Sequence, residues 1–209
     1  IRGETTITAT GNDVTLNLET NDFDSDDNGT DGRLVTITGK DVDIRNSDAF
    51  NLGVQTISNN LTVQAGGNID DGGALTVGGT TNLTATGYVK MNDSDSDYTG
   101  PVNVTALGGQ IVLKDDNSID LGTISGAGTF TVTASMDTTG TVTQSGTITV
   151  ANRTIINNSG GDVTLETEAN NFGNGSDTND VRVTAANVKI KNADTLEVAN
   201  STVSGTYTV

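Results

Sequence analysis

The sequence predicts an all-β protein, a right-handed parallel β-helix in which short strands stack coil upon coil. The first observation behind this is an internal repeat: Val14, Val89 and Val163 begin equivalent segments, 75 and then 74 residues apart. A fixed period of this length is typical of an array whose units share one core. The second is composition, since Thr and β-branched residues are abundant, Gly counts 26 residues and aromatics only 3%, which favours strands and turns over helices.

The expected strands are short runs in which apolar residues alternate with Thr, so that one face turns inward and the other outward. Turn residues such as Gly66-Gly67 and Ser159-Gly160-Gly161 separate them. Strands this short need neighbours above and below to be stable. The clearest runs are Val14–Leu16, Val35–Ile37, Leu61–Val63, Leu75–Val77, Phe130–Val132, Ile148–Val150, Val163–Leu165 and Tyr207–Val209.

We interpret residues 1–209 as one β-helical segment with repeats at about 13–87, 88–161 and 162–209, the last incomplete. Each repeat would then contain three or four coils. The alternative is a string of tandem β-sandwich domains, one per repeat. Against it, the chain lacks Trp and Cys, and a repeat of this length is short for a sandwich.

Two stretches, residues 60–87 (NLTVQAGGNIDDGGALTVGGTTNLTATG) and 141–154 (TVTQSGTITVANRT), carry a resemblance. They resemble the β-helical stalks of large bacterial adhesins of the filamentous haemagglutinin and autotransporter type. The resemblance implies an extracellular, cell-surface rod or filament without enzymatic activity. It implies no particular ligand, and a cell-surface or glycan receptor is a separate partner class that we consider for such a rod.

Charge and missing residue types exclude several functions. The formal charge is −17, from 10 basic and 27 acidic residues, which disfavours binding to nucleic acid or to anionic lipid. The chain has neither His nor Cys, which removes the commonest catalytic triads and zinc sites. No apolar run is long enough to insert into a membrane as a helix. We therefore expect a protein that is not an enzyme.

An acidic insertion in the first repeat is the candidate metal site. Asp24, Asp26 and Asn28 alternate and are followed by Gly29, which matches the opening of a calcium-binding loop. Asp31 would add a further carboxylate. The closing Glu of such loops is missing, so the alternative is an ordinary solvated loop. Calcium is the only cofactor that the sequence suggests.

Acidic residues also occur at 93–97 and 173–180, the matching places of the other repeats. We expect the same corner of the rod to carry them in every copy, with calcium as a weaker hypothesis there. A carbohydrate-binding or carbohydrate-processing β-helix is the alternative function, and the doublets Asp70-Asp71 and Asp115-Asp116 would supply its carboxylates.

Five of the seven aromatic residues align with apolar positions of the repeats, so we expect them in the core or stacked at the ends of the rod: Phe23, Tyr98, Phe172, Phe130 and Tyr207. Neither end of the sequence has a distinct polar or helical cap. Unpaired strand edges recruit further strands. We therefore expect each end to meet a neighbouring segment or another copy of the chain, head to tail.

Overall fold

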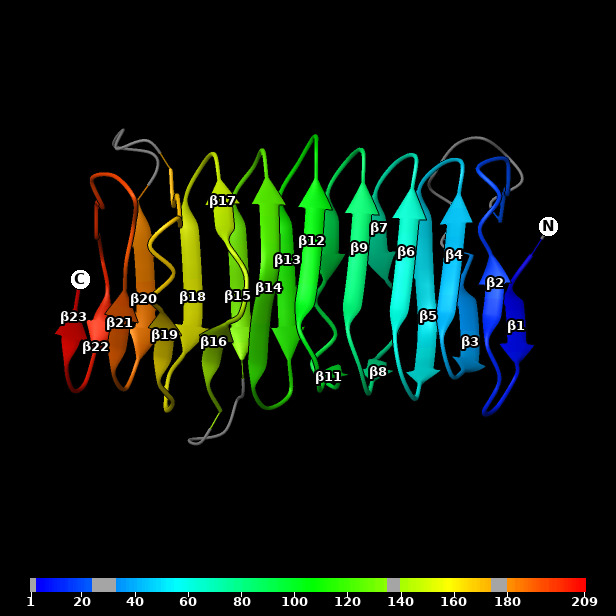
Figure 1. Ribbon diagram of the computed structural model, residues 1–209, viewed down its shortest axis with the longest axis horizontal. Helices are drawn as coiled ribbons and strands as arrows, with labels where there is room; N and C mark the ends of the chain where they lie inside the picture. Colours follow the sequence, from blue (N-terminus) through cyan, green and yellow to red (C-terminus); the bar gives the residue numbers. More distant parts are fainter. Residues whose placement is uncertain (1–2, 24–32, 135–139, 174–179) are drawn as a thin grey trace.

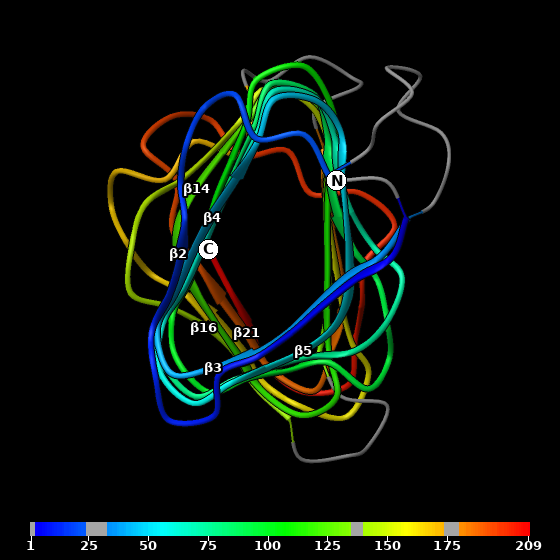
Figure 2. The same ribbon diagram turned by 90° about the vertical axis from the view of Figure 1, so that its right-hand side faces the viewer.

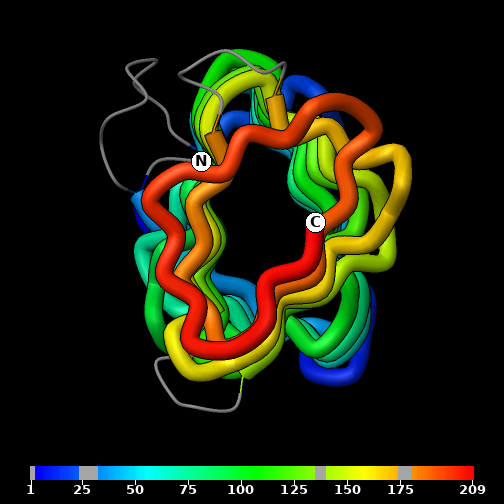
Figure 3. The backbone as a smooth tube through the Cα atoms, turned by 90° about the vertical axis from the view of Figure 1, so that its left-hand side faces the viewer, coloured from blue at the N-terminus to red at the C-terminus, as the bar shows by residue number. Residues whose placement is uncertain are grey.

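The computed structural model describes residues 3–23, 33–134, 140–173 and 180–209. These residues form no helix and wind into a solenoid with a single long axis (Figure 1). Seen from the N-terminal end, the chain turns clockwise as it recedes, and from the C-terminal end it turns counter-clockwise as it approaches (Figures 2 and 3). The solenoid is therefore right-handed, as the sequence predicts.

Two sheets run the length of the solenoid, and the chain alternates between them. The main path of the first sheet contains β1 (Thr5–Thr8), β3 (Val35–Gly39), β5 (Phe50–Ile57), β7 (Ile69–Asp71), β10 (Val89–Met91), β13 (Ile111–Asp115), β15 (Phe130–Ala134), β18 (Thr154–Asn158), β20 (Val181–Ala185) and β22 (Thr202–Val203), and β8 (Leu75–Val77) and β11 (Asp97–Tyr98) lie beside it. The second contains β2 (Val14–Leu16), β4 (Val42–Asn46), β6 (Leu61–Ala65), β9 (Thr81–Ala85), β12 (Val102–Ala106), β14 (Ile119–Gly126), β16 (Val142–Gln144), β19 (Val163–Leu165), β21 (Val188–Ile190) and β23 (Tyr207–Thr208), and β17 (Ile148–Val150) pairs with β14.

Every pairing among the described strands is parallel, and most neighbours lie in simple register. Val63 of β6, for example, lies opposite Ile44 of β4 on one side and Leu83 of β9 on the other. All three side chains are buried. Because successive residues of a strand face opposite sides, one apolar column after another fills the interior, and a single hydrophobic cluster extends from Val14 to Ile190. Tandem β-sandwiches are antiparallel, so that alternative is wrong.

One sequence repeat corresponds to three and a half turns of the solenoid. Val14 lies in β2 of the second sheet, and three further turns bring the chain to β9 of the same sheet. Another half turn leads to β10 in the first sheet, which contains Val89. Val163 lies in β19, back in the second sheet. Equivalent residues of successive repeats therefore lie on opposite sheets.

The two longest strands show the same half-turn relation. β5 and β14 each contain eight residues, and each pairs on one side with two short strands, β7 and β8 or β16 and β17. In each, the register shifts at a glycine, Gly53 or Gly122. β5 belongs to the first sheet and β14 to the second. The expectation of one shared acidic corner is therefore wrong for the middle repeat, which is turned by half a coil. Residues 24–32 and 174–179, in the acidic segments of the other two repeats, lie outside the described residues.

Candidate functional site

The residues proposed from the sequence as calcium ligands lie outside the described part of the structure. These are Asp24, Asp26, Asn28 and Asp31. The site hypothesis for them stays a prediction from the sequence.

A different acidic group comes together in the middle repeat. Asp97 of β11, Asp115 at the end of β13 and Asp116 in the following turn place one carboxylate oxygen each within 4.8 Å of one another. In the sequence, residues 93–97 and 115–116 are separate acidic features. The solenoid joins them, since the segment containing β11 lies against the end of the next coil's strand.

Asp115 is buried in this group and holds the backbone of the preceding coil. Its Oδ2 accepts a hydrogen bond of 2.9 Å from the backbone N–H of Tyr98, and its Oδ1 accepts one of 2.8 Å from the N–H of Asn117. Burial raises the pKa of Asp115 to about 6. The two N–H donors act in the opposite direction, while the charges of Asp97 and Asp116 add to the rise.

Equivalent contacts in the other two repeats use asparagine. Asn46 at the end of β4 accepts the N–H of Phe23 at 2.9 Å, and Asn192 after β21 accepts the N–H of Phe172 at 3.0 Å. We call these three contacts the clasps, each joining an aromatic residue's N–H to a side-chain oxygen of the next coil.

The clasps were missed in the sequence, although a signal was present. The aligned apolar pairs Val42/Ile44, Ile111/Leu113 and Val188/Ile190 are each followed two residues later by Asn46, Asp115 or Asn192. An amide or carboxylate at an inward-facing place needs a hydrogen-bond partner. That requirement could have identified the position, though not the partner.

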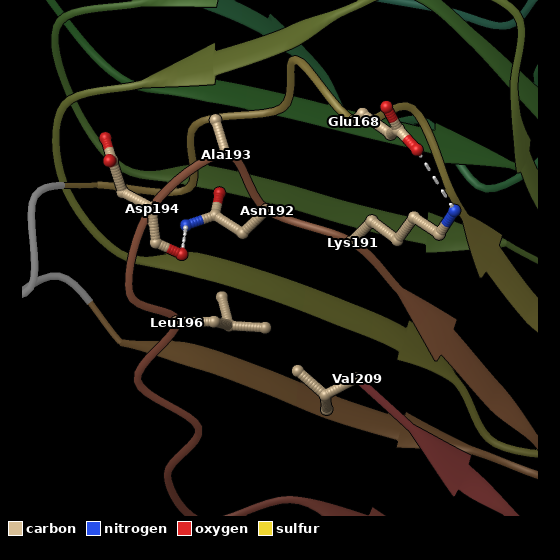
Figure 4. Close-up of a pocket in the computed structure, with 7 residues that line it drawn as sticks. All are labelled: Glu168, Lys191, Asn192, Ala193, Asp194, Leu196 and Val209. Atoms are coloured by element: carbon tan, nitrogen blue, oxygen red, sulfur yellow. Dashed lines mark hydrogen bonds and ion pairs between the residues drawn. The ribbon is translucent and has the colours of Figure 1, made fainter.

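The last clasp borders a shallow pocket at the C-terminal end, lined by Glu168, Lys191, Asn192, Ala193, Asp194, Leu196 and Val209 (Figure 4). Asn192 donates through Nδ2 to the backbone oxygen of Asp194 at 3.2 Å, and Lys191 Nζ lies 3.7 Å from Glu168. The pocket is lined by an amide, an ion pair and aliphatic side chains, and its carboxylates do not point toward a common centre. We therefore assign it no chemistry.

The doublet Asp70-Asp71 serves contacts within the fold. Asp70 Oδ2 accepts the Tyr88 hydroxyl at 2.7 Å, and Asp71 Oδ2 accepts the N–H of Asp93 at 2.8 Å. Burial raises the pKa of Asp71, and the hydrogen bond from Asp93 opposes that rise. Both residues belong to strand β7, and their partners explain the doublet by contacts within the fold.

Asp180 is the described acidic residue of the segment 173–180 in the third repeat, and it is almost fully buried. Its carboxylate accepts hydrogen bonds from the Nε groups of Arg153 and Arg182. Burial alone would raise the pKa of Asp180, but the two arginines more than offset this and the pKa is lowered. Both of its oxygens already have cationic partners, which leaves this carboxylate poorly placed for calcium.

The aromatic side chains form no exposed platform. Phe23, Phe50, Tyr98, Phe130 and Phe172 are buried, and the rings of Phe23 and Phe50 stack with centroids 5.7 Å apart. The other two, Tyr88 and Tyr207, are half-buried. The five residues that align between repeats lie in or against the core, as the sequence suggests.

Among the described residues, no helix is long and apolar enough to cross a membrane. No curated protein and no solved structure matches the chain. A family described as repeats of unknown function (DUF5649) matches residues 1–28, 39–105 and 108–179, most of the sequence. The last two segments begin 69 residues apart, the offset that also separates Asn46 from Asp115. The chain therefore belongs to this family of repeats.

Proposed function

We propose that this chain is a non-enzymatic structural rod, a stalk or filament segment of a large bacterial adhesin displayed outside the cell. The observation that carries the proposal is the continuous core: one hydrophobic cluster and two sheets extend through all the described coils. Each coil contacts only its neighbours, so such an array makes a spacer whose length depends on the number of repeats. Its resemblance to adhesin stalks supports the extracellular location.

The two ends of the solenoid support head-to-tail stacking with neighbouring segments or with copies of the chain. β1 and β2 are the terminal strands of the two sheets at one end of the solenoid, and β22 and β23 are the terminal strands at the other end. At these ends the apolar side chains of Ile7, Leu16, Val203 and Tyr207 pack against the core but remain only partly buried. A further coil would bury them and pair the open strand edge.

The N-terminal edge directs backbone donors away from the solenoid, where this pairing would use them. Thr5 N–H donates to the Leu34 oxygen at 2.9 Å and Ala9 N–H to the Thr38 oxygen at 2.8 Å. Since alternate residues of a strand direct their backbone groups to opposite sides, the N–H groups of Thr6 and Thr8 point away from β3.

Replacing Thr6 by proline should block stacking and leave the rod folded. Proline removes an outward N–H and places its ring on the edge, a place where sheets tolerate it. We expect the wild-type protein to form rod-like oligomers whose sedimentation coefficient rises with concentration. Thr6→Pro should remain monomeric, whereas the matched variant Thr6→Val, which keeps the N–H, should still associate. A wild-type protein that stays monomeric at every concentration would contradict head-to-tail assembly, and a compact scattering profile would contradict the rod.

The chemistry of the described carboxylates supports a structural role over a carbohydrate-processing one. Asp71 and Asp115 accept backbone N–H groups, and Asp180 accepts two arginines. A glycosidase needs one carboxyl group free to give a proton and a second free to attack the sugar or to activate a water molecule. The buried aromatic rings likewise disfavour a sugar-binding platform, so carbohydrate binding ranks second.

Calcium binding by the first insertion is proposed from sequence alone, with Asp24, Asp26, Asn28 and Asp31 as ligands. If they bind the ion, calcium at a hundredfold excess over its Kd should stabilise the protein by about 2.7 kcal/mol. Magnesium should substitute poorly because it demands a tighter octahedral shell. Asp26→Ala should remove the calcium effect on the melting temperature. A wild-type melting temperature that is the same in calcium and in chelator would leave an ordinary solvated loop.

A further inference from the structure

The three clasps occupy equivalent positions of the repeats, and the acceptor side chain of one of them, Asp115, can bind a proton. Asn46, Asp115 and Asn192 each follow the same pair of inward apolar residues, and each accepts an aromatic residue's N–H at 2.9–3.0 Å. The turns after them are of equal length, since Phe50, Ile119 and Leu196 each come four residues later. Two repeats have a neutral amide at this place, and the middle repeat has an acid.

The asparagines form a second bond that a carboxylate cannot form. Asn46 Nδ2 donates to the backbone oxygen of Ala49 at 2.7 Å, and Asn192 Nδ2 donates to that of Thr195 at 3.3 Å. Both acceptors lie three residues after the clasp. An ionised Asp115 has no hydrogen to donate, and its Oδ1 instead accepts the N–H of Asn117. A proton on Oδ1 would give Asp115 a donor on the atom that corresponds to Nδ2, and the backbone oxygen three residues later is that of Ser118.

The elements that pack around Asp115 contribute several negative charges. Asp97 of β11 and Asp116 of its own turn lie in the same group. Besides burial, the charges of Asp71 in β7 and of Asp93, which precedes β11, raise the pKa of Tyr98 together with the charge of Asp115. Among the described residues, none of Asp97, Asp115 and Asp116 forms an ion pair.

Strand β15, which is described up to Ala134, adds no charge beside the clasp. On the β15 side, Asp115 pairs in register with Ala134. A charge on Asp115 is thus buried among like charges, and a proton relieves both the burial and the repulsion.

We propose that Asp115 is a protonatable clasp: by taking up a proton it becomes the neutral counterpart of Asn46 and Asn192, and the junction between the Tyr98 coil and the next one is stabilised. The stabilisation comes from removing a buried charge that lies among other carboxylates, not from the Tyr98 hydrogen bond, which a carboxylate accepts as well. The middle of the rod is then its pH-sensitive point.

The sign of the effect follows from linkage. The pKa of Asp115 in the folded protein is about 6, above the value of about 3.9 for an unfolded aspartate. The folded state therefore binds the proton more tightly, so the stabilisation is present at low pH and is lost as the pH rises through 6. Between pH 7.5 and pH 5 this group alone should lower the unfolding equilibrium constant about tenfold.

The test compares urea unfolding from pH 5 to pH 7.5 in chelator, for wild type, Asp115→Asn and the reciprocal variant Asn46→Asp. Wild type should gain stability toward pH 5. In Asp115→Asn, the roughly tenfold decrease of the unfolding equilibrium constant that Asp115 contributes between pH 7.5 and pH 5 should be absent. Asn46→Asp should acquire a pH dependence of its own, although a weaker one, because Glu19 at that site is paired with Arg45. Parallel profiles for wild type and Asp115→Asn would overturn the proposal.

A measurement on the wild-type protein keeps the proposal testable if a variant fails to fold. Carboxyl carbon NMR should give Asp115 a midpoint near pH 6, and a midpoint below pH 4 would overturn the proposal. Amide exchange adds a local readout. After correction for the intrinsic rate, protection of the Tyr98 N–H should rise toward pH 5, while protection of the Phe172 N–H should not. Equal behaviour of the two amides would also count against the clasp.

Discussion

Replacing Phe130 by alanine is expected to lower the free energy of unfolding by about 3–5 kcal/mol. Phe130 is fully buried in β15 and lies between Ile111 of β13 and Thr154 of β18. In a solenoid each coil is stabilised by the coils above and below it. The cavity therefore weakens two interfaces, and the parallel sheets have few means of collapsing to fill it. Urea unfolding followed by circular dichroism measures the loss.

Thr131→Ala is the matched control, because Thr131 is the next residue of the same strand and faces outward, half-buried. Its replacement should change stability by no more than about 0.5 kcal/mol. An equal loss for both variants would mean that strand propensity, rather than core packing, sets the stability of this coil.

The strands themselves could be predicted from the sequence. An apolar-Thr-apolar run has a period of two and can bury one face only. Val163–Leu165 and Leu75–Val77, expected as strands, are β19 and β8 with the same bounds. Parallel stacking followed as well, since strands of three to five residues cannot form a stable hairpin alone.

The relation between repeat and turn could not be predicted, because the repeat fixes sequence spacing and not where the chain crosses between sheets. Val14 and Val89 look alike, yet β2 and β10 lie on opposite sheets. Nothing local distinguishes three or four turns from three and a half. The value depends on the summed lengths of all intervening turns and insertions.

The clasps illustrate a second limit. The alignment of Asn46, Asp115 and Asn192 is visible in the sequence, but their partners lie 17 to 23 residues away along the chain. Only the stacking of coils shows that these side chains bind the N–H groups of the aromatic residues. The burial of Asp115 among other carboxylates likewise depends on which turn lies above it.

Close contact between coils leads to the second large expected effect. Replacing Gly66 by alanine should destabilise the protein by about 2–4 kcal/mol. Gly66 follows β6, and its N–H donates a hydrogen bond of 3.0 Å to the backbone carbonyl oxygen of Asn46 in the preceding coil. An added Cβ would overlap the Ser47 carbonyl oxygen and lie 2.7 Å from its carbonyl carbon. Both atoms belong to backbone that the coil's own pairing holds in place, so one coil must move away from the next.

Gly126→Ala separates this effect from the general cost of changing a glycine. A Cβ there would meet the Ile111 Cδ1 atom at 2.8 Å, and the end of a flexible side chain can move aside. We expect a loss below about 1 kcal/mol. Thermal and urea unfolding of the two variants should therefore differ clearly. If Gly66→Ala proves as mild as Gly126→Ala, the coils can shift along the solenoid axis, and the spacing between them is set by side-chain packing rather than by backbone contact.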